Sequence, residues 1–238
     1  MRCRFLVISM LEYDRSMSDE ERRHSVASEA YLIDDEQLRA EAEARNGLIQ
    51  FDRACSMIID AIEKGPSWKL RPSAILTLHR AALDGISSYA GNFRPANVAI
   101  SGSQHKPVEA HRVPELIEEL CDYVNEKWNE RTAVHLSSYV MWRLNWIHPF
   151  SDGNGRTSRM VSYLVLSVRL GMLLPGRDTI PDQIVYNRKP YFSALEEADM
   201  AAAAGALELK KMEELIEGML AKQLMGVMQS ATGKNFEQ

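Results

Sequence analysis

Apolar residues recur at every third or fourth position through most of the chain, and this spacing is typical of amphipathic α-helices. Gly65-Pro66 and Gly171 each stand where an apolar run ends. The pattern predicts helices over residues 35–63, 73–83, 114–128, 133–147, 155–170 and 201–229. The helix over 155–170 is apolar on most of its sides, so we expect it at the centre of the fold. The predicted fold class is therefore all-α, a helical bundle.

One stretch departs from the helical spacing. Residues 97–101 alternate polar and apolar side chains, Gly102-Ser103 offers a turn, and residues 106–108 return. An alternating run, a turn and a second short run predict a β-hairpin. We therefore expect one small hairpin in an otherwise helical protein.

Composition narrows the function classes. Of the 238 residues, 45% are hydrophobic and 26% are charged, as in ordinary globular proteins, and this length suits one domain with appended helices. A net charge of −5 gives no reason to expect a nucleic-acid partner. Three cysteines without metal-like spacing fit a reducing compartment. Since no apolar run approaches the roughly 20 residues of a membrane span and no leader-peptide cleavage site follows the first apolar run, we expect a cytoplasmic protein without a membrane partner.

The residues that carry chemistry gather between the helices predicted over 133–147 and 155–170. Residues 148–159 read His-Pro-Phe-Ser-Asp-Gly-Asn-Gly-Arg-Thr-Ser-Arg. Pro149 stops the preceding helix, so His148 is held at a helix end. Gly153-Asn154-Gly155 favours a backbone whose N–H groups turn inward at the start of the next helix, where unpaired amides and the helix dipole both attract phosphate.

Three charged residues complete this loop. Arg156 and Arg159 are three positions apart, so their guanidinium groups share one helix face and can both bind phosphate oxygens. Cations at a helix N-terminus oppose the dipole, which indicates that they serve a ligand. Asp152 supplies the oxygen ligand that Mg²⁺ prefers when it bridges phosphates. A plain glycine-rich turn explains each residue singly, but it does not explain the set.

At these residues the chain resembles the Fic family, whose signature is His-Pro-Phe-x-(Asp/Glu)-Gly-Asn-Gly-Arg-x-x-Arg; every fixed position is present. The resemblance implies an all-helical protein adenylyltransferase that transfers AMP from ATP to a Tyr, Thr or Ser hydroxyl of a target protein. It implies His148 as the general base and Asp152 as the Mg²⁺ ligand. The implied nucleotide-binding residues are Gly153, Asn154, Gly155, Arg156 and Arg159, with the arginines on the β- and γ-phosphates. The phosphorylating Doc branch has lysine in place of the second glycine, so Gly155 argues against phosphorylation.

Two further segments resemble the same family. Gly91-Asn92-Phe93-Arg94 is similar to the segment that precedes the family's target-docking flap. The resemblance implies that an extended target peptide pairs with the flap through main-chain hydrogen bonds, and the flap residues are Val98, Ala99, Ile100 and Ser101. Residues 188–195 resemble the segment that closes the nucleotide pocket, which implies Tyr191 and Phe192 beside the adenine.

The N-terminal segment carries another motif. Ser18-Asp19-Glu20-Glu21 predicts the start of a helix that runs through Ala30. Within it, Ser25-Val26-Ala27-Ser28-Glu29-Ala30 resembles the family's inhibitory-helix motif, (Ser/Thr)-x-x-x-Glu-(Gly/Asn), and departs from it at Ala30. The resemblance implies that Glu29 pairs with Arg159 and keeps ATP in an unproductive pose, with Ser25 as the first position of the inhibitory motif.

The remaining polar residues of note have structural interpretations. His79 lies on an apolar helix stripe and is predicted to be a core histidine. His105 and His111 precede a helix and are predicted to be solvated, whereas Asn46 and Gln50 are predicted to be helix-surface or buried amides without chemistry.

The predicted organisation has four parts: a flexible N-terminus over 1–17, an inhibitory helix region over 18–34, a Fic domain over 35–200, and a C-terminal helix and tail over 201–238. The C-terminal helix would pack on the core or mediate self-association into a homo-oligomer.

Three alternatives to AMP transfer remain open. One is removal of AMP from a modified protein, in which Glu29 would position water for attack at phosphorus. Another is transfer of a different phosphate-linked group at the same loop. A third is a regulator that senses ATP without turnover, although His148 and Asp152 weigh against it because pure binding needs no base.

Overall fold

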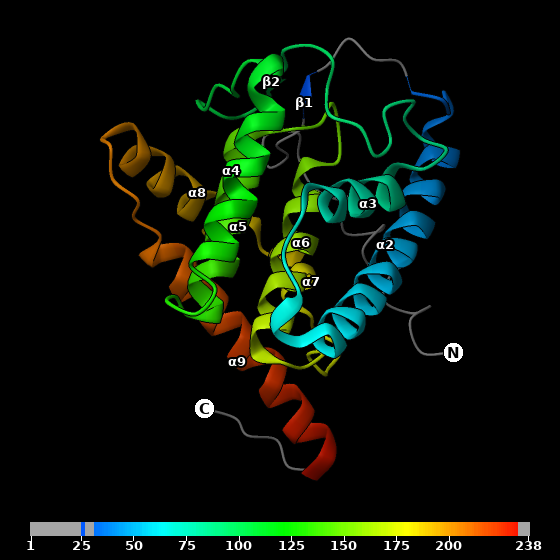
Figure 1. The fold of residues 1–238 in the computed structure, drawn as a ribbon. Coiled ribbons are helices and arrows are strands. Elements are labelled where there is room, and N and C mark those ends of the chain that lie inside the picture. The colour runs from blue at the N-terminus through cyan, green and yellow to red at the C-terminus, as the bar shows by residue number, and fades with distance from the viewer. Residues whose placement is uncertain (1–24, 27–30, 233–238) are drawn as a thin grey trace.

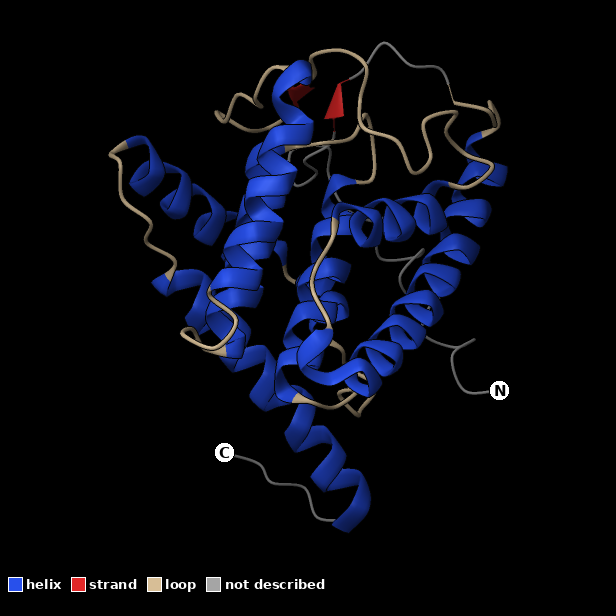
Figure 2. Ribbon diagram, viewed as in Figure 1, coloured by secondary structure: helices blue, strands red, loops and turns tan. Residues whose placement is uncertain are grey.

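The structure is a computed structural model that describes residues 25–26 and 31–232, and within them it is almost entirely helical (Figures 1 and 2). The prediction of an all-α bundle is confirmed. The α-helices are α2 (Glu36–Lys64), α3 (Pro72–Leu83), α4 (Val113–Glu126), α5 (Ala133–Ile147), α6 (Asn154–Leu170), α7 (Ile180–Tyr186), α8 (Arg188–Ala203) and α9 (Lys210–Thr232). Two short 3₁₀ turns, η2 (Gly65–Ser67) and η3 (Ala110–Arg112), lie before α3 and α4.

Helix α6 lies at the centre, as its apolar pattern predicted. It packs against α5, α2, α3 and α7. Val161, Leu164 and Val165 on α6 are almost completely buried, and they share one hydrophobic core with side chains from α2 to α9. Helices α5 and α6 run side by side as a hairpin in Figure 1, so the loop between them is held by the best-packed pair of elements.

Two buried amides join α2 to the end of α3. The amide nitrogen of Asn46 donates to the carbonyl of Asp84 at 2.8 Å, and that of Gln50 donates to the carbonyl of Leu78 at 3.0 Å. The carbonyl of Asp84 is at the C-cap of α3, beyond the donors of the helix itself, so the Asn46 amide supplies its partner. Of the two interpretations for Asn46 and Gln50, the structure shows the buried amide.

The two strands pair in a way that the sequence did not predict. Strand β1 (Ser25–Val26) pairs antiparallel with β2 (Ala99–Ile100), with Ser25 opposite Ile100. The prediction of a helix is therefore wrong at Ser25 and Val26. The rest of the segment predicted to be an inhibitory helix, Glu29 included, lies outside the described residues, apart from residues 31–34.

The predicted hairpin is also wrong in its second strand. Residues 106–108 form no strand within the described part of the chain; instead, the guanidinium of Arg94 donates to the carbonyl of Val108. The side chain of Asn97 accepts a hydrogen bond from the N–H of Ala110 at 2.8 Å. Side chains thus bond to the backbone at Val108 and Ala110, and β2 pairs with β1 instead.

The C-terminal region is two helices rather than one. Helix α8 runs to Ala203, and the chain turns at Gly205, whose φ is +78°, before α9 begins at Lys210. Helix α9 packs on α5, α7 and α8, with Met212 and Ile216 fully buried. Packing on the core is therefore confirmed for this helix.

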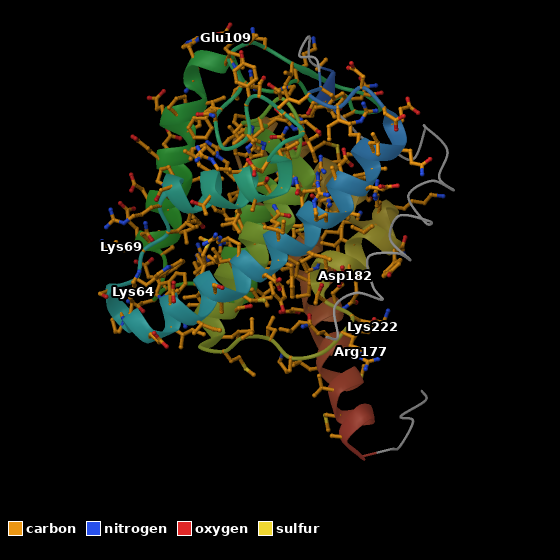
Figure 3. All side chains as sticks on the ribbon, turned by 90° about the vertical axis from the view of Figure 1, so that its right-hand side faces the viewer. Lys64, Lys69, Glu109, Arg177, Asp182 and Lys222 are labelled. Carbon is orange, nitrogen blue, oxygen red and sulfur yellow. The ribbon has the colours of Figure 1, made fainter. Side chains whose placement is uncertain are left out.

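The two strands and the cavity described below lie at one end of the bundle. Figure 3 places Glu109, in the loop after β2, at this end, and it places Arg177 and Lys222 towards the opposite end, beside α9. Among the described helices, none combines the length and the apolar character that crossing a bilayer would require.

We predict that the site depends on the packing of α6. Replacing Leu164 by Ala removes a side chain that is 1% exposed, and we expect a loss of about 2–5 kcal/mol in the free energy of unfolding. The matched control is Leu170→Ala on the same helix, where the side chain is 42% exposed and the expected change is within about 0.5 kcal/mol. Urea denaturation followed by circular dichroism measures both. Equal losses would contradict the central position of α6.

Candidate functional site

His148 occupies an unusual backbone position at the end of α5. Its φ of 54° and ψ of 61° lie in the left-handed region, and it is the only non-glycine residue with positive φ in residues 25–26 and 31–232. Its N–H still donates to the carbonyl of Leu144 at 3.0 Å, so the residue caps the helix while turning the chain away from it. A side chain in this region costs energy, so surrounding contacts must hold it there.

Arg94 supplies those contacts. Its side chain is 3% exposed, and its Nε donates to the carbonyl of His148 at 2.8 Å. Its backbone N–H donates to the carbonyl of Pro149 at 2.9 Å, and its other nitrogens donate to the carbonyls of Ala96 and Val108. Burial lowers the pKa of Arg94. One buried guanidinium thus fixes the His148 backbone and the loop after β2 relative to each other.

The imidazole of His148 is buried and neutral. Its Nε2 lies 2.8 Å from the hydroxyl oxygen of Ser25, and only 7% of the residue is exposed. Burial lowers the pKa of His148 to about 4, and the backbone of Asn145 offsets this effect in part. We assign the ring proton to Nδ1, so that Nε2 accepts the hydrogen bond from Ser25. The ring is therefore a base held against a hydroxyl.

The loop from Phe150 to Asn154 is closed by the side chain of Asn154. Its amide oxygen accepts from the N–H of Phe150 at 2.9 Å, and its amide nitrogen donates to the carbonyl of Phe150 at 2.7 Å. The same nitrogen lies 3.2 Å from the hydroxyl oxygen of Ser25. The Asn154 side chain therefore shapes the loop and contacts the hydroxyl, while its main chain opens α6.

His79 braces this loop from α3. Its ring stacks on Phe150 with the centroids 3.7 Å apart. Its Nδ1 accepts from the N–H of Gly91 at 2.9 Å, so the proton is assigned to Nε2, which donates to the carbonyl of Asp152 at 3.1 Å. The prediction of a satisfied core histidine is confirmed for His79.

Gly153 is required on two grounds. Its φ is +74°, and a Cβ atom there would lie 2.6 Å from a methyl carbon of Leu83. A side chain at this position would therefore be strained by the backbone conformation and would force the buried Leu83 side chain to move. Since this glycine is also the N-cap of α6, the helix begins without a side-chain cap. Its first N–H groups are the kind of donors that bind phosphate.

The two predicted arginines lie on the first turns of α6. Arg156 pairs with Asp152 at 3.0 Å and with Glu43 of α2 at 3.5 Å. Burial lowers the pKa of Arg156, but these two carboxylates outweigh it and hold the pKa above its usual value. A Cβ atom at Gly155 would lie 3.1 Å from a guanidinium nitrogen of Arg159, so the small residue leaves room for that side chain.

These elements enclose a cavity of about 830 Å³. One side of the cavity is lined by the strand residues Ser25 and Ile100 and by His148 at the end of α5. Another side is lined by the start of α6. Arginine and carboxylate side chains share the wall, which is lined by Glu36, Arg39, Glu43, Asp152, Arg156, Arg159, Arg188 and Asp199. The volume is in the range of small-molecule sites.

Tyr31 and Glu43 are wall residues that the sequence did not single out. The guanidinium carbon of Arg39 lies 4.3 Å from the centre of the Tyr31 ring. Burial, followed by the charges of Asp152 and Glu43, raises the pKa of Tyr31. No local pattern marks either residue, because each reaches the cavity only through the packing of α2 and the segment before it.

Tyr191 contacts its neighbours through its hydroxyl, and its ring has little surface exposed to the cavity. It is 2% exposed, and its hydroxyl lies 2.8 Å from the amide nitrogen of Asn145, which also lies 2.8 Å from the hydroxyl of Ser158. Phe192 next to it is half-buried and lines the cavity. Within this pair, Phe192 offers the larger exposed aromatic surface.

Of the four flap residues, only the middle two are in a strand, Ile100 lines the cavity, and Ser101 begins the turn that follows. Ala99 and Ile100 form β2, and Val98 and Ser101 flank it. The prediction that His105 is solvated is wrong. This residue, in the loop after β2, is half-buried, and its Nε2 lies 2.7 Å from the carbonyl of Trp146. His111 is exposed, as expected.

The donor set fits Mg²⁺ that arrives with a nucleotide, rather than a metal held by the protein alone. Among the residues that the structure describes, no three His, Cys, Asp or Glu side chains gather as a metal site. Asp152 does present a carboxylate to the cavity, one residue before the N-cap of α6. One carboxylate with substrate phosphates is an arrangement that Mg²⁺ often adopts.

Comparison with known proteins points to one family. Residues 69–166 match the model described as the Fic/DOC family. A probable protein adenylyltransferase of Aquifex aeolicus is 31% identical over 111 residues, which are 46% of this chain and 31% of the relative. The protein adenylyltransferase fic-1 of Caenorhabditis elegans is 26% identical over 198 residues, which are 74% of this chain and 36% of the relative. The chain thus spans about a third of the length of these curated relatives.

The fold is shared with solved structures. A Fic-domain-containing signalling protein from Bacteroides thetaiotaomicron superposes with a TM-score of 0.66 at 21% identity, over 84% of this chain and 76% of that one. A Caenorhabditis elegans Fic-1 fragment superposes with a TM-score of 0.60 at 21% identity, over 84% of this chain and 55% of that one. At this identity the likeness establishes the helical fold.

We predict that His148 titrates far below an ordinary histidine. Because burial disfavours the charged ring, its pKa is about 4, compared with about 6.5 for a free imidazole. The ring therefore stays a neutral base as the pH falls from 7 to 5, and it is protonated only near pH 4. NMR titration of the histidine ring protons, with His148→Asn to assign the signal, measures this. A His148 midpoint near 6.5 would contradict the buried site.

Proposed function

Because this chain is a Fic family protein, we propose that it is a Mg²⁺-dependent protein adenylyltransferase that transfers AMP from ATP to a hydroxyl side chain. The observation that carries the proposal is a hydroxyl held 2.8 Å from Nε2 of a buried, neutral His148, next to the uncapped N-terminus of α6. A base, a hydroxyl and a phosphate-binding helix end meet in one cavity. That is the set that hydroxyl attack on a phosphate ester needs.

The proposed mechanism assigns one task to each side of the cavity. His148 accepts the hydroxyl proton through Nε2 as the oxygen attacks the α-phosphorus. The first N–H groups of α6, with Arg156 and Arg159, bind the β- and γ-phosphates and stabilise the charge on the departing pyrophosphate. When bound, Mg²⁺ would be held by Asp152 together with the phosphates, and it would offset part of that same charge.

Gly155 supports transfer of AMP rather than of the γ-phosphate. A side chain at this position would press on the guanidinium of Arg159, since its Cβ would lie 3.1 Å away. A larger residue, such as the lysine of the phosphorylating branch, would therefore crowd the guanidinium of Arg159 and shift it. With glycine at this position, the β- and γ-phosphates would bind at the start of α6, and the α-phosphorus would face His148.

We also propose how the partners bind. The adenine would lie near Tyr191 and Phe192, with Phe192 offering the exposed ring face. A target protein would add an extended segment to the edge of β2, over Val98 to Ser101, and so present its hydroxyl to His148. Strand β1 pairs with this edge, so a target must replace it.

Autoinhibition by Glu29 remains part of the proposal. Its support is the sequence motif from Ser25 to Glu29 and the presence of Arg159 in the cavity wall. In this scheme Glu29 would pair with Arg159, and the γ-phosphate of ATP would have to displace it.

We predict the following labelling pattern with α-labelled ATP and Mg²⁺. Glu29→Gly transfers more label to protein than the wild type, because the arginine is released for phosphate. Adding His148→Ala to Glu29→Gly lowers transfer by roughly 10²–10⁴-fold, because the general base is lost. Gel autoradiography of the chain with a cell lysate measures all three proteins.

Two results would contradict this function. If the three proteins remain unlabelled while γ-labelled ATP labels protein, the group transferred is phosphate. If nothing is labelled but ATP binds equally to wild type and His148→Ala, the chain is an ATP sensor.

We further predict that Glu43 weakens ATP binding. Its carboxylate is 3.5 Å from Arg156 and faces the cavity where the phosphates would bind. Glu43→Gln should therefore tighten ATP binding roughly 2- to 5-fold, the range of a partly exposed ion pair. Isothermal titration calorimetry in the His148→Ala background measures this without turnover. Glu41→Gln is the matched control, because Glu41 is exposed on the same helix, and equal effects would exclude a specific role for Glu43.

A further inference from the structure

The hydroxyl bound to His148 belongs to the chain itself, and from this we propose that Ser25 is an acceptor: the protein adenylylates its own Ser25, in cis. The inference rests on the proposed function and names a substrate of that same site. It also changes the expectation for Ser25, which the sequence placed in an inhibitory helix. The structure places it in a strand at the flap edge.

The backbone presents Ser25 as a docked target would be presented. Ser25 lies opposite Ile100 in the antiparallel pairing of β1 and β2, and both residues line the cavity. An added strand on a flap edge is held through main-chain hydrogen bonds, whatever its sequence. Ser25 and Val26 of the chain itself therefore occupy the edge proposed for targets.

The hydrogen bonds orient the hydroxyl for attack. A serine hydroxyl has one proton to donate and two lone pairs that accept. The Asn154 amide nitrogen, at 3.2 Å, can only donate, so it takes one lone pair. The proton then goes to Nε2 of His148, at 2.8 Å. One lone pair of the Ser25 oxygen remains for a phosphorus atom in the cavity.

The cavity retains space for the nucleotide with Ser25 in place. Its volume of about 830 Å³ is measured with Ser25 in the wall, and the wall also includes Gly153, Asn154, Gly155 and both arginines. Ser25 therefore stands at the side of the cavity without filling it. A nucleotide with its phosphates at the start of α6 would have its α-phosphorus on the side that faces His148.

The proposed step is balanced as a simple substitution. The Ser25 oxygen forms a bond to the α-phosphorus of ATP, and the bond from that phosphorus to the bridging α–β oxygen breaks. The hydroxyl proton moves to Nε2 of His148, and pyrophosphate leaves with the electron pair of the broken bond. The imidazolium then returns its proton to water, which leaves adenylylated Ser25, pyrophosphate and the original base.

The pairing also makes the reaction intramolecular. Because β1 and β2 belong to one chain, the acceptor needs no encounter with a second molecule. A well-oriented intramolecular group reacts at a high effective concentration. The fraction of Ser25 modified per unit time should therefore not change with protein concentration.

The experiment incubates the full chain with ATP and Mg²⁺, and peptide mass spectrometry locates the adenylyl group. It is run in the wild type and in Glu29→Gly, so that inhibition cannot hide the reaction. We expect modification at Ser25, at a rate that is unchanged over a tenfold dilution. Ser25→Ala should lose this modification, Ser25→Thr should retain an adenylylated side chain at position 25, and Ser28→Ala, a serine three positions later, should be modified at Ser25 like its parent.

A mixing experiment tests the cis step. His148→Ala keeps Ser25 but lacks the base, and an affinity tag separates it from active chains after they are mixed. Its Ser25 should remain unmodified in the presence of active wild type. Modification of the inactive chain, or a rate that falls on dilution, would overturn the intramolecular step.

The same labelling experiment separates adenylylation of Ser25 from adenylyl transfer in general. If lysate proteins receive AMP while Ser25 of both the wild type and Glu29→Gly stays unmodified, Ser25 is not an acceptor but adenylyl transfer stands. If neither the chain nor any lysate protein receives AMP in either background, both proposals fail. If the label is found on another residue of the chain and Ser25 is clean, the assignment of Ser25 is overturned.

Discussion

The left-handed backbone of His148 is the constraint on which the rest of the site depends. A helix that ended in the ordinary way would continue along its axis, whereas this turn brings the imidazole to the start of the next helix. The buried guanidinium of Arg94 holds the turn by its bond to the His148 carbonyl, and the stack of His79 on Phe150 supports the loop that follows. The base is thus positioned by α5, α3 and the flap loop together, and its burial keeps it neutral.

Charge balance in the cavity follows from the same arrangement. The start of α6 carries two arginines, and the carboxylates of Asp152 and Glu43 offset the charge of Arg156. Phosphates that entered the cavity would replace these carboxylates as the partners of the arginines. The buried guanidinium charge would then remain paired. Strand β1 pairs with β2, so this strand edge is covered in the structure.

Much of this could be predicted from sequence, and the reasons for the failures are physical. The helices from α2 to α6 follow from apolar spacing, and the loop of His148 follows from its proline and glycines, because these are local preferences. The partner of β2 could not be predicted, because Ser25 and Ile100 pair across a long sequence separation through backbone groups that leave no side-chain pattern. The prediction of a second hairpin strand was wrong, and the carbonyl of Val108 in that segment accepts a hydrogen bond from buried Arg94 instead. Helix α7 is too short for apolar spacing to predict it. The turn at Gly205, between α8 and α9, depends on a single residue, so apolar spacing did not predict where one helix ends and the next begins.

In the proposed function, the hydroxyl against His148 and the phosphate site at α6 belong to one reaction. The most direct measurement is a crystal structure of the full chain with Mg²⁺ and an ATP analogue that cannot release pyrophosphate. We expect the β- and γ-phosphates at the first turn of α6 beside Arg156 and Arg159, with the α-phosphorus about 3–3.5 Å from the Ser25 oxygen, the distance of a reactive pair. Phosphates bound away from the start of α6, or an α-phosphorus turned away from both Ser25 and His148, would contradict it.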